Sequence, residues 1–166
     1  MKIIHITYIL ILFMISTANI KAQESEISWG ISASVQDAQL DISLPVWTGS
    51  NNIIAPTLGV IYMDNRGTDL RLGLIDRFFI KATEKIKPFV GLRAGALFTF
   101  PNEGENVIDY IIGVFSGGEY FFSDNFSVGV EAQLNISISD KSSSRFGNPG
   151  GVNLNTGTAI FATIYF

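Results

Sequence analysis

The chain of 166 residues contains no cysteine and a single histidine, His5, close to the N-terminus. The absence of cysteine excludes structural disulfides, thiolate catalysis and cysteine-ligated metal sites. Charged residues are scarce, at 16% of the chain against roughly 25% in an average soluble domain, while hydrophobic residues reach 47%. Disordered chains and solvated helical bundles both need more charge than this, so the composition excludes them. The length is typical of one domain.

The N-terminus has the pattern of a secretory signal peptide. Lys2 precedes an uncharged, mostly apolar stretch that is densest at 9–15, and polar residues follow Ala22. The dense core is much shorter than the roughly 20 residues of a spanning helix, which disfavours a membrane anchor. We predict cleavage of a signal peptide 1–22 after Ala22, with Ala18 as the alternative site, and a mature domain of residues 23–166. No cysteine stands at either site, so a lipoprotein is excluded.

Removal of this segment leaves an acidic chain without histidine. The mature chain keeps 11 − 2 = 9 basic residues and all 15 acidic residues, for a net charge of −6. An acidic balance without basic clusters argues against nucleic acid as a partner. Without histidine, Ser-His-Asp catalysis and histidine-ligated metal sites are excluded. We therefore expect no enzymatic activity, no cofactor and no metal site.

Two acidic pairs leave narrower alternatives open. Glu119 and Glu131 flank one turn, and a carboxylate pair can act as general acid and base, although pairing with arginines is the favoured interpretation. Glu103 and Glu105 could attract Ca²⁺ or bridge lipopolysaccharide through cations, but two such acids are more often simply solvated.

Alternation of apolar and polar residues, the period of a β-strand, dominates the mature chain. From Phe126 to Ser139 it continues for fourteen residues without an error. Ordinary strands have about 5–6 residues, whereas tilted membrane-spanning strands need about 9–11. The pattern predicts an all-β, eight-stranded antiparallel up-and-down transmembrane β-barrel, with strands near 27–36, 39–47, 54–63, 68–81, 88–100, 107–121, 126–139 and 154–166.

The polar face of these strands differs from an ordinary water-facing surface. It is rich in Gly, Ser, Asn and Gln, and Gly91 and Gly95 flank Arg93 in a way that would make room for an inward arginine. Charges inside an eight-stranded barrel must pair, because an unpaired buried charge is very costly. We predict a lumen charge network formed by Asp41, Arg71, Arg77, Arg93, Asp109, Glu119 and Glu131, with Lys81 as a further cation at a strand end.

Aromatic residues lie near the strand ends on the opposite, apolar face. Such residues form girdles at the two membrane interfaces of β-barrels. The candidates are Trp29, Tyr62, Phe78, Phe98, Phe100, Tyr110, Tyr120, Phe122, Phe126 and Phe166. Eight strands place both chain ends in the periplasm, and residues 140–153 then form the fourth and longest outer loop.

Asp76 breaks the pattern. It falls on the apolar face between Leu74 and Phe78. Either Asp76 lies near a membrane interface, where a charge costs about 0–1 kcal/mol, or a β-bulge shifts the register there.

The segment Gly118–Glu131 and the C-terminal Ile164-Tyr165-Phe166 resemble small outer-membrane β-barrel proteins of the OmpA/OmpX type and the "porin family" proteins of Bacteroidetes-like, Gram-negative bacteria. The resemblance implies export to the outer membrane, contacts with lipid and lipopolysaccharide, and a C-terminal assembly signal, Ile164, Tyr165 and Phe166, for the barrel assembly machinery. We expect no peptidoglycan-binding domain of the kind that larger members carry.

These patterns lead to one expected function and two alternatives. We expect an outer-membrane barrel with a filled polar lumen and a structural or surface-interaction role, with an unknown ligand possible at the outer loops. The first alternative is a narrow porin-like channel for small solutes or ions. The second is a secreted soluble β-barrel that binds a small apolar ligand inside.

Overall fold

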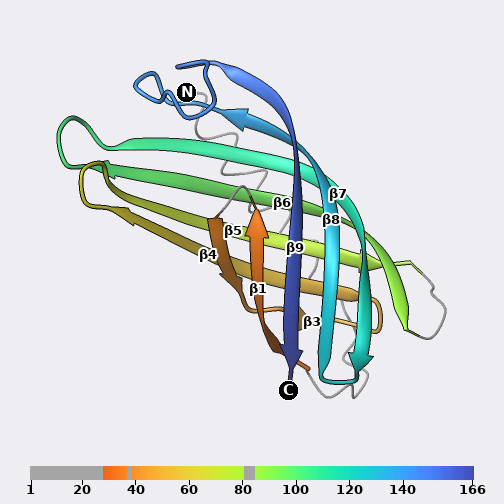
Figure 1. The fold of residues 1–166 in the computed structure, drawn as a ribbon. Helices are drawn as coiled ribbons and strands as arrows, with labels where there is room; N and C mark the ends of the chain where they lie inside the picture. The colour runs from red at the N-terminus through yellow and green to blue at the C-terminus, as the bar shows by residue number, and fades with distance from the viewer. Residues whose placement is uncertain (1–27, 37–38, 81–84) are drawn as a thin grey trace.

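The computed structural model describes residues 28–36, 39–80 and 85–166. Nine strands are present there: β1 (Gly30–Gln36), β2 (Gln39–Ser43), β3 (Val46–Trp47), β4 (Asn52–Met63), β5 (Gly67–Phe79), β6 (Ile86–Pro101), β7 (Val107–Ser123), β8 (Phe126–Ile138) and β9 (Val152–Tyr165). They form one antiparallel sheet in the order β2-β1-β9-β8-β7-β6-β5-β4-β3, and an additional β2–β4 pairing closes it (Figure 1). The described residues form no helix, and none of their segments is a helix that could cross a membrane.

The nine strands make an eight-stranded barrel because β2 and β3 share one position in the wall. β4 pairs with both, through Thr57 opposite Ser43 and Ile54 opposite Val46. The predicted strand 39–47 is thus interrupted at Leu44-Pro45. Proline has no N–H to donate to a ladder, and Pro45 and Pro56 both lie at this break, where their carbonyls accept from Gly30 N (2.8 Å) and Leu44 N (3.0 Å). The other predicted strands correspond to β1 and β4–β9.

The polarity of the wall is that of a membrane barrel. Large apolar side chains are exposed along the outside of every long strand, for example Leu72, Leu92, Val114, Leu134 and Ile160. Buried polar and charged side chains point inward between them. All ten predicted girdle aromatics lie on the outer surface, and only Phe98 among them is half-buried.

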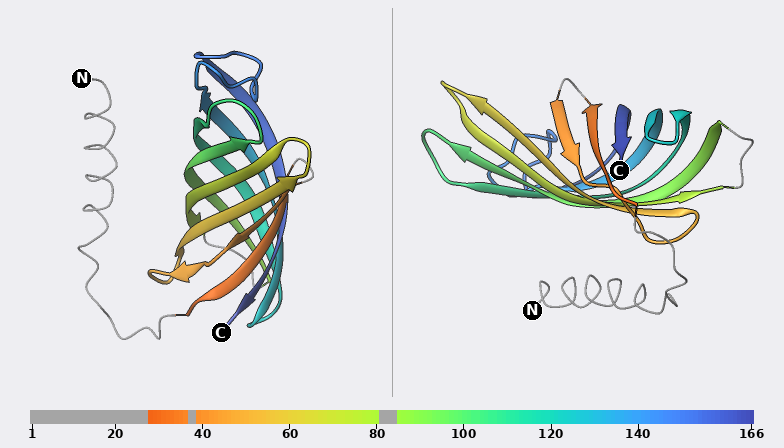
Figure 2. Two further views of the ribbon diagram at one scale, coloured as in Figure 1. Left: turned by 90° about the vertical axis from the view of Figure 1, so that its left-hand side faces the viewer. Right: turned by 90° about the horizontal axis from the view of Figure 1, so that it is seen from below.

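The two ends of the barrel differ. The terminal end holds the start of β1, the C-terminus and the tight turn at Asp124-Asn125, and the loop end holds the connection between β8 and β9 (Figures 1 and 2). The predicted signal peptide 1–22 and Lys81 lie outside the described residues.

The interior near the terminal end contains an aromatic cluster beside its buried polar side chains. Phe79, Phe89, Phe115, Phe161 and Tyr165 form a buried cluster with Ile53 and Ala55, and Trp47, Ile75 and Phe121 pack against it. The expectation of a filled polar lumen is therefore incomplete, because part of the filling is aromatic. The inward-facing Phe and Tyr residues occupy the same alternate positions as the polar residues. The alternation pattern alone therefore did not show that they face inward.

Asp76 lies on the outer face without a bulge. The β4–β5 and β5–β6 registers run unbroken through it, which overturns the register-shift explanation. Its carboxylate accepts a hydrogen bond from Asn52 Nδ2 (2.6 Å), and Thr48 donates to the Asn52 side chain in turn. The cluster lies close to the terminal end of β5, so Asp76 is satisfied by neighbours near the barrel rim.

Candidate functional site in the barrel lumen

Near the terminal end, Arg77 is buried in the lumen. Its Nη1 donates to Glu119 Oε2 (3.0 Å), and its Nη2 lies 3.8 Å from Glu131 Oε2. The guanidinium also lies over two rings of the aromatic cluster, with its carbon 4.6 Å from the Phe89 centroid and 4.2 Å from the Phe161 centroid. The buried positive charge is thereby neutralised by carboxylates and covered by aromatic faces.

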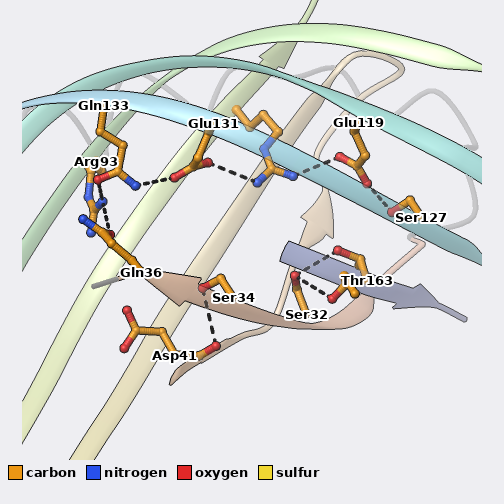
Figure 3. A network of polar contacts seen from close by, with 12 residues as sticks. Ser32, Ser34, Gln36, Asp41, Arg93, Glu119, Ser127, Glu131, Gln133 and Thr163 are labelled. Atoms are coloured by element: carbon orange, nitrogen blue, oxygen red, sulfur yellow. Dashed lines mark hydrogen bonds and ion pairs between the residues drawn. The ribbon is translucent and has the colours of Figure 1, made fainter. Parts of the chain in front are cut away.

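Glu119 is fully buried and accepts from three side chains. Besides Arg77, Tyr165 Oη donates to its Oε1 (2.9 Å). The Ser127 hydroxyl donates to the same oxygen (Figure 3). Charge-assisted hydrogen bonds of this kind stabilise an ionised carboxylate.

At mid-height, two arginines have different partners. Arg71 Nη1 bonds Asp41 Oδ2 at 2.7 Å. Arg93 donates instead to amide oxygens, to Gln36 Oε1 at 3.2 Å and to Gln133. Gln133 Nε2 then donates to Glu131 Oε1 (2.6 Å), so Arg93 reaches a carboxylate only through an amide relay (Figure 3).

At the loop end, the long connection between β8 and β9 folds over the lumen. Arg145 Nη2 bonds Asp69 Oδ2 (2.7 Å) and Thr99 Oγ1 (2.8 Å), and its Nε lies 3.5 Å from Asp109 Oδ2. The Ser143 hydroxyl donates to Asp109 Oδ2 (2.7 Å), and the backbone N–H of Asp140 donates to Asp109 Oδ1 (2.8 Å). We call this set of contacts the loop latch.

The structure places all seven predicted charges inside the barrel but groups them in three levels. Glu119, Arg77 and Glu131 lie near the terminal end, Asp41, Arg71 and Arg93 at mid-height, and Asp109 in the loop latch. The sequence pattern did not single out Arg145. It lies in a Ser/Gly/Asn-rich loop, where apolar–polar alternation does not indicate which side chains face the lumen. Asp69 is two residues before Arg71 on the same strand, so both side chains face the lumen. Alternation could therefore have predicted Asp69 as a lumen residue.

Three glycines in the wall, Gly91, Gly117 and Gly129, make room for rings of the aromatic cluster. A Cβ on Gly91 would lie 2.1 Å from the Phe115 ring, and a Cβ on Gly129 would lie 2.1 Å from the Phe161 ring. We expected Gly91 to clear space for Arg93. The side chain that fills the space beside Gly91 is Phe115, so this expectation named the wrong residue.

The C-terminal residues join the wall to the lumen. Ile164 and Phe166 are exposed outside, and Phe166 packs on Trp29 with centroids 4.7 Å apart. Tyr165 points inward to Glu119. The strand is thus held on both faces.

The candidate carboxylate pair of the lumen has defined partners. Both members of the predicted carboxylate pair, Glu119 and Glu131, are engaged by Arg77. The described part of the chain has no cluster of three metal-ligating side chains. A pocket lined by Asp41, Arg71 and Arg145, among others, has a volume of about 10 Å³, which is room for about one water molecule.

Comparison with known proteins identifies the fold. No family model matches the sequence, and no curated protein matches it. Among solved structures, the chain is similar to Neisserial surface protein A, with a TM-score of 0.52, 15% identity, and coverage of 84% of this chain and 94% of that one. It also matches the N-terminal β-barrel domain of Pseudomonas aeruginosa OprF (TM-score 0.49, 14% identity, 84% and 96% coverage) and Ail of Yersinia pestis (0.45, 12%, 84% and 96%). The chain has the fold of the eight-stranded outer-membrane β-barrels.

Proposed function

We propose that this protein is exported to the bacterial outer membrane, where it is a barrel with a sealed lumen and a structural or surface-interaction role. The apolar exterior supports insertion in a bilayer, because a membrane barrel exposes apolar side chains to lipid where a soluble protein exposes charged ones to water. The signal peptide 1–22, membership of the OmpA/OmpX-type proteins, and contacts with lipopolysaccharide and the assembly machinery belong to the same proposal.

The proposal of a sealed lumen rests on one observation: side chains fill the lumen at both of its ends. The aromatic cluster and Arg77 fill the terminal end, and the loop latch covers the loop end. An eight-stranded barrel leaves an interior just wide enough for side chains. A soluble barrel with an inner apolar ligand would need the aliphatic face inside, whereas most of the large aliphatic side chains of this wall face outward and only a few, such as Leu97 and Ile111, are buried.

Planar-bilayer recording of the purified, refolded protein tests the seal. We expect no stable current steps above the bilayer background, with a large porin as the positive control. Reproducible single-channel steps would overturn the sealed lumen and favour the narrow-channel alternative. An absence of enzymatic activity is part of the proposal as well, because the chain has no catalytic histidine outside the predicted signal peptide.

A further inference from the structure

Asp76 is the one acidic residue of the described strands that faces outward, toward the proposed lipid. Its Oδ1 accepts a hydrogen bond from Asn52 Nδ2 (2.6 Å), whereas no arginine or lysine of the described residues forms an ion pair with the carboxylate. A charge on the lipid face of a membrane protein is costly, and such charges commonly mark functional sites. A cation from outside the described residues would therefore stabilise Asp76.

A hollow in the outer wall begins beside Asp76. Leu92 is opposite Asp76 in the β5–β6 ladder, and Phe78 and Val90 are opposite each other two residues nearer the terminal end. These three apolar side chains line a shallow hollow of about 650 Å³ that extends over β7 and β8 to Leu134. Small-molecule sites have volumes of about 300–1,000 Å³, so the hollow is large enough for part of a lipid.

Short side chains give the hollow its depth. Ser116 and Ala132 are opposite each other in the β7–β8 ladder and both line the hollow. The larger Val114 and Leu134 form the next outward pair toward the loop end and line it as well. An apolar chain that lies beside these larger side chains gains contacts that a flat wall would not offer.

The hollow runs from the terminal rim toward the middle of the wall. Asp76 is only three residues from Phe79, the terminal end of β5. Following paired residues from Asp76 across β6 and β7 leads to Leu134, which is eight residues from Phe126, the terminal end of β8. Barrel strands are tilted by about 35–45° to the axis, so this line of pairs also moves along the axis. A molecule with its polar head at Asp76 therefore directs an apolar tail toward the centre of the bilayer.

We propose that Asp76 and this hollow bind a phospholipid with a primary ammonium in its head group, from the leaflet at the terminal end. The ammonium donates to Asp76 Oδ2, which accepts from none of the described residues, and one acyl chain lies in the hollow. A primary ammonium has three N–H donors, whereas a trimethylated ammonium has none. This inference goes beyond the proposed function and rests on the membrane location that the proposed function includes.

Other occupants fit the site less well. A divalent metal ion such as Ca²⁺ takes about six to eight oxygen ligands, and the described part of the chain has no group of three metal-ligating side chains. A second copy in a symmetric pair would bring its own anionic Asp76 to the same interface. A molecule with a positive head and an apolar tail matches both the carboxylate and the hollow.

Lipid retention by the purified, refolded protein tests the site. The protein is inserted in vesicles with equal parts of phosphatidylethanolamine, phosphatidylcholine and phosphatidylglycerol, all with the same acyl chains. It is then extracted in mild detergent, and the lipids that stay bound are quantified by native mass spectrometry. Phosphatidylcholine carries a trimethylated ammonium and phosphatidylglycerol carries none. We expect bound phosphatidylethanolamine to exceed each of the others by about tenfold, as expected for one charge-assisted hydrogen bond.

Two pairs of variants separate the head-group contact from the hollow. Asp76→Asn should abolish the preference for phosphatidylethanolamine, whereas Asp124→Asn, which changes an exposed carboxylate in the turn at the terminal end, should keep it. Ala132→Phe fills the hollow and should lower the retention of phosphatidylethanolamine several-fold. Ala33→Phe, which enlarges an outward residue of β1 outside the hollow, should leave retention unchanged.

Three results would overturn the lipid site. The first is equal retention of phosphatidylethanolamine and phosphatidylcholine, or a preference that survives Asp76→Asn. The second is displacement of the bound lipid by excess soluble ethanolamine, which has the ammonium but no acyl chain and would identify a simple cation site. The third is a wild-type dimer that Ala132→Phe makes monomeric, which would identify a second copy as the occupant.

The comparison of lipids in the wild-type protein needs no variant, so the test stands even if a variant does not fold. Flotation of the vesicles shows separately whether the protein inserts. Protein that does not float with the vesicles contradicts the proposed membrane location. Inserted protein without a preference for phosphatidylethanolamine contradicts the lipid site alone, so the two failures are distinguishable.

Discussion

The guanidinium carbon of Arg77 lies 4.2 Å from the centroid of the Phe161 ring, while the same guanidinium bonds Glu119. The two contacts join the charge network to the aromatic cluster, so neither fills the terminal end alone. Arginine suits this junction, because its planar guanidinium stacks on aromatic rings through its face and donates hydrogen bonds from its edge.

Loss of the Glu119 charge should destabilise the barrel strongly. Glu119→Gln leaves Arg77 buried with only the more distant Glu131, and breaking a buried pair from one side costs about 3–5 kcal/mol. The free energy of unfolding in urea, measured in lipid vesicles, should fall by that order. The double variant Arg77→Met, Glu119→Gln should recover part of the loss. The exposed Glu103→Gln is the matched control and should change little. Equal stability of Glu119→Gln and the wild type would contradict the pairing.

The fit of Phe161 against Gly129 predicts a steric effect. Gly129→Ala brings a Cβ onto the Phe161 ring and should cost about 1–3 kcal/mol of stability, as overpacking of a core does. Gly118→Ala is the control, because nothing lies within 4 Å of a Cβ there. Adding Phe161→Leu to Gly129→Ala should reduce the penalty. A penalty unchanged by Phe161→Leu would show that the ring is not the obstacle.

The loop latch should control access of water to the loop end without making the barrel a channel. Because the chain has no cysteine, Thr99→Cys provides a unique thiol beside Arg145. Adding Arg145→Ala should speed its reaction with a small water-soluble thiol reagent by about tenfold, through easier local opening. The exposed Lys141→Ala should leave the rate unchanged. Bilayer current should stay at background, since the aromatic cluster still closes the terminal end. An unchanged thiol rate would argue against the latch.

The C-terminal Phe166 should matter for assembly. Phe166→Ser removes the packing on Trp29 and alters the last residue of the predicted assembly signal. We expect the amount of folded barrel in the outer membrane to fall several-fold. Phe122→Ser, another exposed aromatic near the terminal end, is the control and should have a smaller effect. Equal yields for the two variants would contradict a special role for the C-terminus.

The strands could be predicted from the sequence because successive residues of a strand face lipid and lumen in turn, and these two environments favour different side chains. Residues 126–139 alternate without error, and β8 spans nearly the same range. The inward arginines and carboxylates followed from parity for the same reason. Partners did not follow, because they depend on how strands are staggered around the barrel: Arg93 meets Gln133 rather than a carboxylate.

Other features were hidden from a pattern-based prediction. Phe115 and Phe161 fit the polar face only because glycines on neighbouring strands clear space for them, which is a relationship across strands. Arg145 belongs to a loop, where no period applies. The break at Leu44-Pro45 had a signal in its proline, since proline cannot donate to a ladder.

Fractionation of cells that express the full chain, followed by electrophoresis of the envelope with and without boiling, tests the central claim most directly. A barrel with an apolar exterior and a filled polar and aromatic lumen should sediment with the outer membrane. It should also migrate differently before and after boiling, because the folded wall resists detergent. A soluble periplasmic or secreted protein without a band shift would contradict the membrane assignment.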